Sequence, residues 1–173
     1  MKIGILTVSD RASRGEYTDL SGPAIASYLE GAVTTPWERI TRVVPDGAGS
    51  VAEAMLDFCD RDRVALLLVT GGTGPAERDQ TPEAMARIID KELPGFGELM
   101  RRISFETVPT AILSRQGAGI RGATLIVILP RKPAAIDVCL GAIFPAVPYC
   151  LELIGAGRLE TNPAVVRTFR PGG

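Results

Sequence analysis

The sequence predicts an α/β fold with three layers, in which a mostly parallel sheet is covered by helices on both faces. Strand-like and helix-like segments alternate in βαβαβα order, which is typical of such sheets. The strand-like segments are apolar runs rich in β-branched residues, as in residues 64–69 and 124–129. The 173 residues are 46% apolar, which is enough for one substantial core, so we expect a single domain over residues 1–173.

Local signals predict the first two strands and the helix between them. Residues 2–8 form an apolar run that predicts the first strand. Pro23 suits the first position of a helix over residues 23–30, with Ser21 as its N-cap. Residues 38–44 alternate apolar and polar side chains, which predicts a strand with one more polar face.

Two helices are expected on either side of a central strand at residues 64–69. The pattern Ser50-x-x-Glu53 matches the capping box of a helix start. The apolar stripe that follows at helical spacing consists of Val51, Ala54, Met55 and Phe58. After the strand, Thr81 is expected to cap a helix that Pro82 begins. The buried stripe of that helix consists of Met85, Ile88 and Ile89.

The second half of the chain predicts three more helices and a last strand. A helix over residues 96–105 is expected from the apolar stripe Phe96, Leu99, Met100 and Ile103. Residues 124–129 form the last strand, Pro133 begins a helix, and Pro145 begins another that ends near residue 154. Residues 155–173 are rich in Gly and Pro and are expected to form an extended C-terminal tail.

Composition and charge exclude several classes of function. A net charge of −1, with no run of Lys or Arg longer than two, argues against binding to polymeric nucleic acid. The chain has no histidine, which excludes Ser-His-Asp and Cys-His catalysis and His-ligated zinc. The N-terminus enters a strand pattern at once, and no apolar run approaches the roughly 20 residues of a membrane span. We therefore expect no signal peptide, no membrane segment, buried cysteines and a cytoplasmic location.

A glycine-rich segment follows the central strand and carries the strongest functional signal. It reads Thr70-Gly71-Gly72-Thr73-Gly74-Pro75 and is followed by Arg78-Asp79 before the next helix start. A strand, a glycine-rich turn and a helix start together offer backbone N–H groups to phosphate. A simple turn needs only one or two glycines with Asn or Asp. We therefore predict a phosphate-binding loop at residues 70–74, with Arg78 as a counter-charge.

A second glycine pattern, G-x-G-x-x-G at residues 117–122, has the wrong context for a dinucleotide site. The dinucleotide motif follows a strand and opens a helix, whereas this segment leads into the strand at residues 124–129. We interpret it as a flexible connection. The P-loop pattern is absent as well, because no Lys follows the glycines at residues 71–74.

Each of three loops at the predicted carboxyl edge of the sheet carries an aspartate: Asp10, Asp46 and Asp79. Ligands bind at this edge in α/β sheets, although turn or capping hydrogen bonds explain Asp46 and Asp79 singly as well. Two carboxylates facing a polyphosphate repel it by roughly 4 kcal/mol per charge pair at close range and moderate dielectric. Asp46 and Asp79 are therefore candidate ligands of a Mg²⁺ ion between them and the phosphates.

Two further basic segments are candidate anion contacts. Ser114-Arg115 precedes the second glycine pattern, and Arg is suited to bind phosphate with two parallel hydrogen bonds. A solvated loop explains the same residues. Arg131-Lys132 lies after the last strand and before a helix start, which is also a favourable position for an anion.

These motifs together resemble the molybdopterin adenylyltransferases of molybdenum cofactor synthesis, the MogA-type bacterial enzymes related to the gephyrin N-terminal domain. The resemblance covers nearly the whole chain. The matching segments are Val8-Ser9-Asp10-Arg11-Ala12-Ser13, Pro45-Asp46, Thr70 to Pro75, Arg78-Asp79, Thr81-Pro82-Glu83, Pro94-Gly95-Phe96-Gly97-Glu98, Leu113-Ser114-Arg115 and Ile120-Arg121.

The resemblance implies transfer of AMP from Mg-ATP to the terminal phosphate of molybdopterin, with release of pyrophosphate. It implies that Asp46 and Asp79 are the catalytic and metal-binding residues, and that Ser114 contacts the pterin. The remaining expected nucleotide or pterin contacts are Ser9, Asp10, Thr70, Gly71, Gly72, Thr73, Gly74, Arg78, Arg115 and Lys132. The resemblance also implies a homotrimer and a downstream partner that inserts molybdenum.

The chain departs from the family pattern at Arg131, where the family usually has Gly within Leu-Pro-Gly-x-Pro. If that position needs a positive φ, an Arg there costs about 1 kcal/mol or more, or the loop changes shape. Two alternatives to the transferase are a non-catalytic molybdopterin or nucleotide-binding scaffold of the same fold, and a phosphate-ester hydrolase. Retention of both Asp46 and Asp79 beside Arg78 favours the enzyme.

Overall fold

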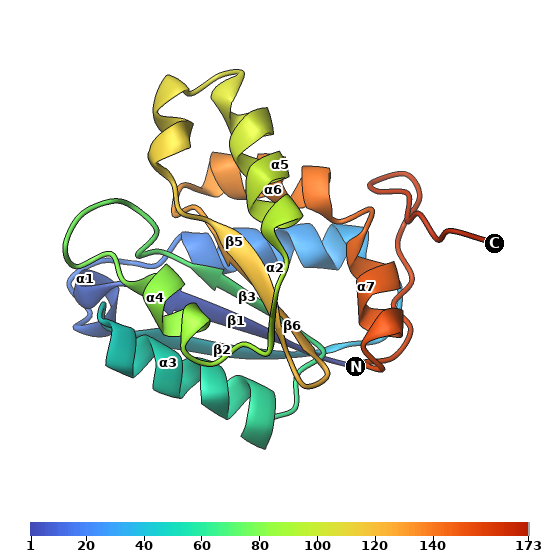
Figure 1. The fold of residues 1–173 in the computed structure, drawn as a ribbon, viewed down its shortest axis with the longest axis horizontal. Helices are drawn as coiled ribbons and strands as arrows, with labels where there is room; N and C mark the ends of the chain where they lie inside the picture. Colours follow the sequence, from blue (N-terminus) through green and yellow to red (C-terminus); the bar gives the residue numbers. More distant parts are fainter. Residues whose placement is uncertain (173) are drawn as a thin grey trace.

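A mixed sheet with the strand order β2-β1-β3-β6-β5-β4 forms the centre of the computed structural model, which describes residues 1–172 (Figure 1). Four adjacent strands are parallel: β2 (Glu38–Val44), β1 (Lys2–Val8), β3 (Leu66–Thr70) and β6 (Thr124–Leu129). The pairings of β5 (Gly117–Arg121) with β6 and of β4 (Lys91–Glu92) with β5 are antiparallel. The predicted mostly parallel sheet is confirmed.

Helices cover both faces of this sheet, as predicted. The α-helices are α1 (Asp10–Ser13), α2 (Ser21–Ala32), α3 (Ala48–Leu56), α4 (Thr81–Ala86), α5 (Pro94–Phe105), α6 (Pro133–Ile143) and α7 (Val147–Leu153). A π-helical turn, η1 (Asp57–Arg61), extends α3, and a 3₁₀ turn, η2 (Pro109–Leu113), follows α5. Figure 1 shows α3 and α4 on one side of the sheet and α2 and α6 on the other.

Two hydrophobic cores result, one on each face. Ile3 and Ile5 of β1 pack with α2, α6 and α7, whereas Leu6 and Val8 pack with α3 and α4. β3 divides its side chains in the same way, because successive residues of a strand point to opposite faces. The central strands are therefore buried on both sides, which explains their nearly continuous apolar sequence.

The predicted N-terminal caps of α2 and α3 are wrong. α2 begins at Ser21, and the carboxylate of Asp19 accepts hydrogen bonds from the amides of Ser21 (2.9 Å) and Gly22 (3.2 Å). α3 begins at Ala48, so Ser50 lies inside it, and its hydroxyl donates to the carbonyls of the preceding turn. The capping box is therefore not formed.

The segment at residues 117–122 is not a flexible connection, because residues 117–121 form strand β5. Ala118 and Ile120 are buried, and a Cβ at Gly119 would lie 2.8 Å from Ile89. Smaller corrections apply to the helices: Leu99 of α5 is 41% exposed rather than buried, and α7 begins at Val147 rather than Pro145.

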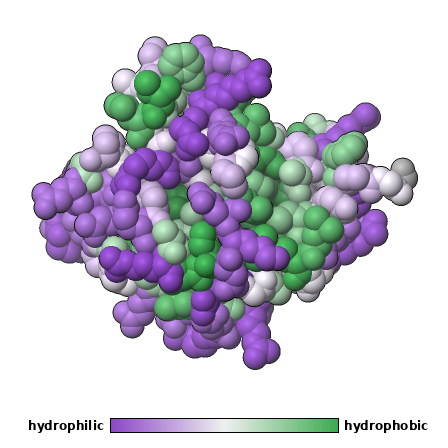
Figure 2. Space-filling model, viewed as in Figure 1, coloured by the Kyte–Doolittle hydropathy of each residue, from purple (hydrophilic) through white to green (hydrophobic). Residues whose placement is uncertain are grey.

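α5 and η2 project from the body of the molecule (Figure 1). Large apolar side chains remain exposed there, and we call this region the apolar arm. Its exposed apolar residues are Leu99, Phe105, Val108, Ile112 and Leu113. Figure 2 shows the corresponding hydrophobic patch at the tip of the projection.

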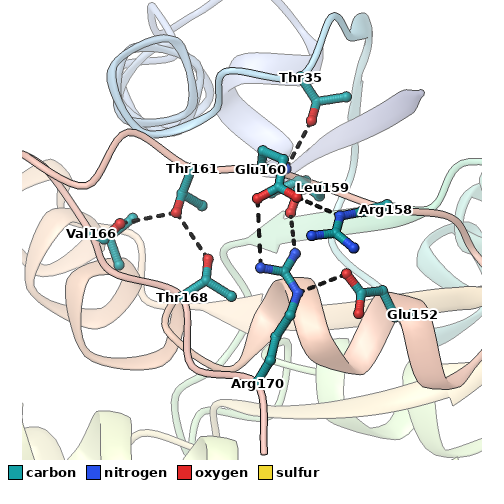
Figure 3. A network of polar contacts seen from close by, with 9 residues as sticks. All are labelled: Thr35, Glu152, Arg158, Leu159, Glu160, Thr161, Val166, Thr168 and Arg170. Atoms are coloured by element: carbon teal, nitrogen blue, oxygen red, sulfur yellow. Dashed lines mark hydrogen bonds and ion pairs between the residues drawn. The ribbon is translucent and has the colours of Figure 1, made fainter. Parts of the chain in front are cut away.

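The C-terminal tail lies against the body through a polar network (Figure 3). The guanidinium of Arg170 donates to Glu152 (2.8 Å) and to the carbonyl of Leu159 (3.0 Å), and it lies 3.5 Å from Glu160. An isolated antiparallel bridge joins Thr161 to Val33. The tail therefore connects the end of α2 to α7.

Within residues 1–172, no single helix is long and apolar enough to cross a membrane. The pair α6 and α7 meets the length and composition limits only when counted together across a 60° bend. Both helices contribute side chains to the core.

Candidate active site

The glycine-rich loop begins where β3 ends and is packed tightly against its neighbours. Thr70 is fully buried, and its hydroxyl donates to the carbonyl of Pro130 (2.8 Å). Gly71 (φ +101°) and Gly72 (φ +62°) have positive φ values that favour glycine. A Cβ at Gly71 would lie closer than 3.0 Å to the Val8 carbonyl, and one at Gly72 would clash with the hydroxyl of Thr81. These two glycines are thus required by the packing of the chain itself.

Thr81 does not act as the predicted N-cap, because it is the first residue of α4. Its backbone amide donates to the Gly72 carbonyl (3.1 Å), and its hydroxyl donates to the Gly71 carbonyl (2.8 Å). The start of α4 therefore fixes the glycine-rich loop through these two hydrogen bonds. This arrangement fixes the backbone that the sequence assigns to phosphate binding.

Asp79 closes a tight turn over residues 74–79. Its amide donates to the Ala76 carbonyl (2.9 Å), and its carboxylate accepts from the Ala76 amide (3.3 Å). A Cβ at Gly74 would lie 2.6 Å from the Asp79 carboxylate, so any larger residue there would require that carboxylate to shift. Arg78 is exposed on the same turn.

Asp10 and Asp46 come together at the carboxyl ends of β1 and β2. Ser9 caps the short helix α1, and its buried hydroxyl accepts from the Ala12 amide (3.3 Å). The Asp10 amide donates to Oδ2 of Asp46, and the Asp46 amide donates to Oδ1 of Asp10. Oδ1 of Asp46 is buried and has no hydrogen-bond partner among the described residues. A Cβ at Gly72 would lie 3.5 Å from this oxygen, so it faces the glycine-rich loop.

Asp46 and Asp79 line two neighbouring cavities rather than one. A cavity of about 500 Å³ contains Asp10, Asp46 and Arg78, and one of about 360 Å³ contains Asp79 and Arg115. The two cavities share Ala76, Glu77 and Gln80. Within residues 1–172, no group of three or more His, Cys, Asp or Glu side chains is placed to hold a metal ion.

Ser114 lies in a third and larger cavity of about 710 Å³ between α4 and the base of α5. Its hydroxyl oxygen is buried and, within the part of the chain that the structure describes, has no hydrogen-bond partner. The lining combines apolar side chains such as Met85 and Ile89 with the polar residues Arg101 and Gln116. Arg101 is held there by a hydrogen bond to the Gln116 carbonyl (2.8 Å).

Arg115 is engaged with the protein itself. Its amide donates to the Thr73 carbonyl (2.8 Å), and its Nε donates to the Gly74 carbonyl (3.0 Å). Its two terminal nitrogens donate to the Asp79 carbonyl and to the Glu83 carboxylate. The hydrogen bond from Arg115 lowers the pKa of the Glu83 carboxyl from its ordinary value.

Arg131 and Lys132 lie between β6 and α6. Among the described residues, Arg63 is the only non-glycine residue with a positive φ, so Arg131 carries no backbone strain of that kind. Its guanidinium donates to the Val8 carbonyl (3.2 Å), and its own carbonyl accepts from Ser21. Lys132 is exposed and precedes the first residue of α6. The loop therefore holds Arg131 without a positive φ.

Several residues of these cavities were not among the predicted site residues. Gln80 accepts a hydrogen bond from the Ala48 amide (3.0 Å) and so joins α3 to the loop before α4. Arg101 and the buried Gln116 belong to the Ser114 cavity. The adjacency of Gln80 to Asp79 and of Gln116 to Arg115 was a usable signal, whereas nothing in the sequence around Arg101 indicated its position.

Comparison with known proteins shows the family of this chain. The family described as "Probable molybdopterin binding domain" matches residues 4–149. The molybdopterin adenylyltransferase of Helicobacter pylori is 49% identical over 169 residues, which cover 98% of this chain and 96% of that protein. The enzyme of the same name from Escherichia coli is 44% identical over 183 residues, covering 99% and 94%.

Solved structures show the same fold. The molybdopterin biosynthesis enzyme MoaB from Thermus thermophilus superimposes with a TM-score of 0.82 at 40% identity, covering 91% of this chain and 98% of that one. This chain belongs to the molybdopterin-binding domain family.

Proposed function

We propose that this chain is a molybdopterin adenylyltransferase, which transfers AMP from ATP to the terminal phosphate of molybdopterin and releases pyrophosphate. Relatives of that name, 44–49% identical over nearly the full length, support the proposal. The structural observation that carries it is the unpaired, buried Oδ1 of Asp46 facing the glycine-rich loop. A buried carboxylate oxygen without a partner is costly, and a bound cation would offset that cost.

The chemistry needs positioning more than a strong base. The phosphate nucleophile is already anionic, so a chain without histidine is sufficient. We assign nucleotide binding to the loop at residues 70–74, supported by Ser9, Asp10 and Arg78. We assign pterin binding to the cavity of Ser114, whose hydroxyl has no hydrogen-bond partner among the described residues. We assign a second pterin contact to Lys132.

We propose Mg²⁺ as the cofactor, held by Asp46 and Asp79. Mg²⁺ is commonly bound by one or two carboxylates plus substrate phosphates and waters, so a protein site with few carboxylates fits this ion. When bound, it would neutralise charge on the phosphates of ATP. Asp46 offers one unpaired oxygen for this role, and Asp79 lies on the adjoining turn.

We further propose a homotrimer, a cytoplasmic location and transfer of the product to a molybdenum-inserting partner. The exposed apolar arm supports self-association, because burying its large apolar side chains would be favourable. Light scattering of the purified chain tests the oligomeric state. A monomer at micromolar concentration would rule out the trimer.

In the decisive experiment, the purified protein is incubated with molybdopterin, ATP and Mg²⁺. We expect adenylylated molybdopterin and pyrophosphate in equal amounts, and neither product when the metal is chelated. Binding of molybdopterin without product would favour the non-catalytic scaffold. Release of phosphate or pyrophosphate without adenylylated pterin would favour a hydrolase.

A further inference from the structure

We propose that Arg115 is a positioning residue, which holds the turn at residues 74–79 so that Asp79 keeps its place beside the glycine-rich loop. The inference rests on the proposed function for its kinetic consequence. Its structural part, that Arg115 fixes the turn, stands on the contacts alone.

The contacts of Arg115 reach both ends of the turn. Nε donates to the Gly74 carbonyl (3.0 Å) at the start, and a terminal nitrogen donates to the Asp79 carbonyl at the end. The Arg115 amide adds a bond to Thr73, the residue before the turn (2.8 Å). The planar guanidinium joins segments 36 and 41 residues away in the chain.

The turn has few other attachments to the body. Residues 75–78 are exposed, and the hydrogen bonds of Asp79 to Ala76 stay within the turn. Gly74 lies next to the Asp79 carboxylate, so a shift of Gly74 would change the position of that carboxylate. Loss of the hydrogen bond from Arg115 to either carbonyl would therefore move Asp79.

The charge of Arg115 is largely matched by the protein. Its second terminal nitrogen pairs with Glu83, and both side chains are partly exposed, at 37% and 46%. An ion pair of this exposure contributes little to stability. The carbonyls of Gly74 and Asp79 thus account for the position of the guanidinium. The competing role for Arg115 is direct binding of a substrate phosphate.

The test compares Arg115→Gln, Arg115→Lys and Glu83→Gln with the control Arg102→Gln, an exposed arginine of α5. We expect kcat to fall about 30-fold in Arg115→Gln, as estimated for two lost hydrogen bonds, with KM for ATP within about threefold of wild type. Lys lacks the planar fork, so Arg115→Lys should not restore kcat. Glu83→Gln and Arg102→Gln should both stay within about threefold of wild type.

Amide hydrogen exchange gives a readout that does not depend on activity. We expect exchange of the hydrogen-bonded Ala76 and Asp79 amides to rise about tenfold or more in Arg115→Gln, while β3 keeps its wild-type protection. A raised KM for ATP with unchanged exchange in the turn would show direct substrate binding and overturn the proposal. Unchanged kcat and exchange would overturn it as well. If the wild type transfers no AMP, the proposed function fails, and exchange still decides whether Arg115 holds the turn.

Discussion

Asp10 and Asp46 exchange hydrogen bonds, because the backbone amide of each donates to the carboxylate of the other, at 2.9 and 3.0 Å. The exchange joins the loops that follow β1 and β2. It uses one oxygen of each carboxylate and leaves Oδ1 of Asp46 without a partner among the described residues. Asp46 is therefore oriented by Asp10 before any ligand binds.

This relationship predicts different effects for two substitutions of Asp10. Asp10→Ala removes the acceptor for the Asp46 amide and should lower stability by about 1–2 kcal/mol, or Tm by roughly 3–6 °C. Asp10→Asn keeps an acceptor oxygen and should recover most of the loss. Thermal unfolding followed by circular dichroism measures both, with the exposed Glu53→Ala as control. Equal losses in the Ala and Asn variants would contradict the role of this hydrogen bond.

Asp79→Asn should reduce turnover by about 100-fold or more while largely sparing molybdopterin binding. The substitution keeps the shape of the side chain but removes the charge that the proposed function assigns to metal and phosphate placement. Steady-state kinetics and a separate measurement of pterin affinity test it. Weakened pterin binding with normal turnover would be the opposite result and would remove Asp79 from the reaction.

Arg131→Gly should be tolerated by the fold. The substitution removes the hydrogen bond to the Val8 carbonyl and adds backbone freedom to the unfolded chain, at a total cost of about 1–2 kcal/mol. We expect Tm to fall by roughly 3–6 °C. A fall well beyond that range would show that Arg131 has a structural role beyond its one hydrogen bond.

Stability should decline at alkaline pH, in part because of Tyr28. Burial raises the pKa of Tyr28 from 10.0 to about 12, with a smaller contribution from Asp137, and burial raises the pKa of Cys59 from 9.0 to about 11. A group with a raised pKa binds its proton more tightly when folded, so its contribution is complete below the unfolded pKa and is lost as pH rises toward the folded pKa. The loss should therefore run from about pH 9 to 12.

Tyr28→Phe tests this prediction. Its hydroxyl is buried without a hydrogen-bond partner in the described part of the chain, while its ring packs edge-on against Phe144 at 5.5 Å, a contact that Phe retains. The variant should be at least as stable as wild type at pH 7 and should show a shallower alkaline decline. Urea unfolding at several pH values measures both. A decline as steep as in the wild type would assign the effect to other groups.

The strands with strong local patterns were predictable, and the weakly patterned ones were not. The predicted bounds of β1, β2 and β6 match the structure because each is a run of apolar or alternating residues. Strand β5 was not predicted, because glycine disfavours strands. Gly119 is needed there because the Ile89 side chain and the Lys91 carbonyl leave no room for a Cβ. Those contacts are tertiary and leave no trace in a local pattern.

The candidate site was predictable as an edge of the sheet but not as a set of contacts. The rule that ligands bind at the carboxyl ends of parallel strands selected the segments that contain Asp10, Asp46 and Asp79, and the structure places Asp10 and Asp46 in contact at that edge. The exchange between Asp10 and Asp46 joins residues 36 apart, and the partners of Arg115 are as distant. Such pairings depend on how loops pack, which residue spacing does not reveal.

The close approach of Gly71 to the Val8 carbonyl affects how inactive variants should be interpreted. Any side chain at Gly71 would push apart the ends of two adjacent strands before a nucleotide was present, so lost activity would come with lost folded protein. A genetic screen that scores cofactor production alone would assign this position to substrate recognition. Measuring the amount of folded protein for each variant would separate the two explanations.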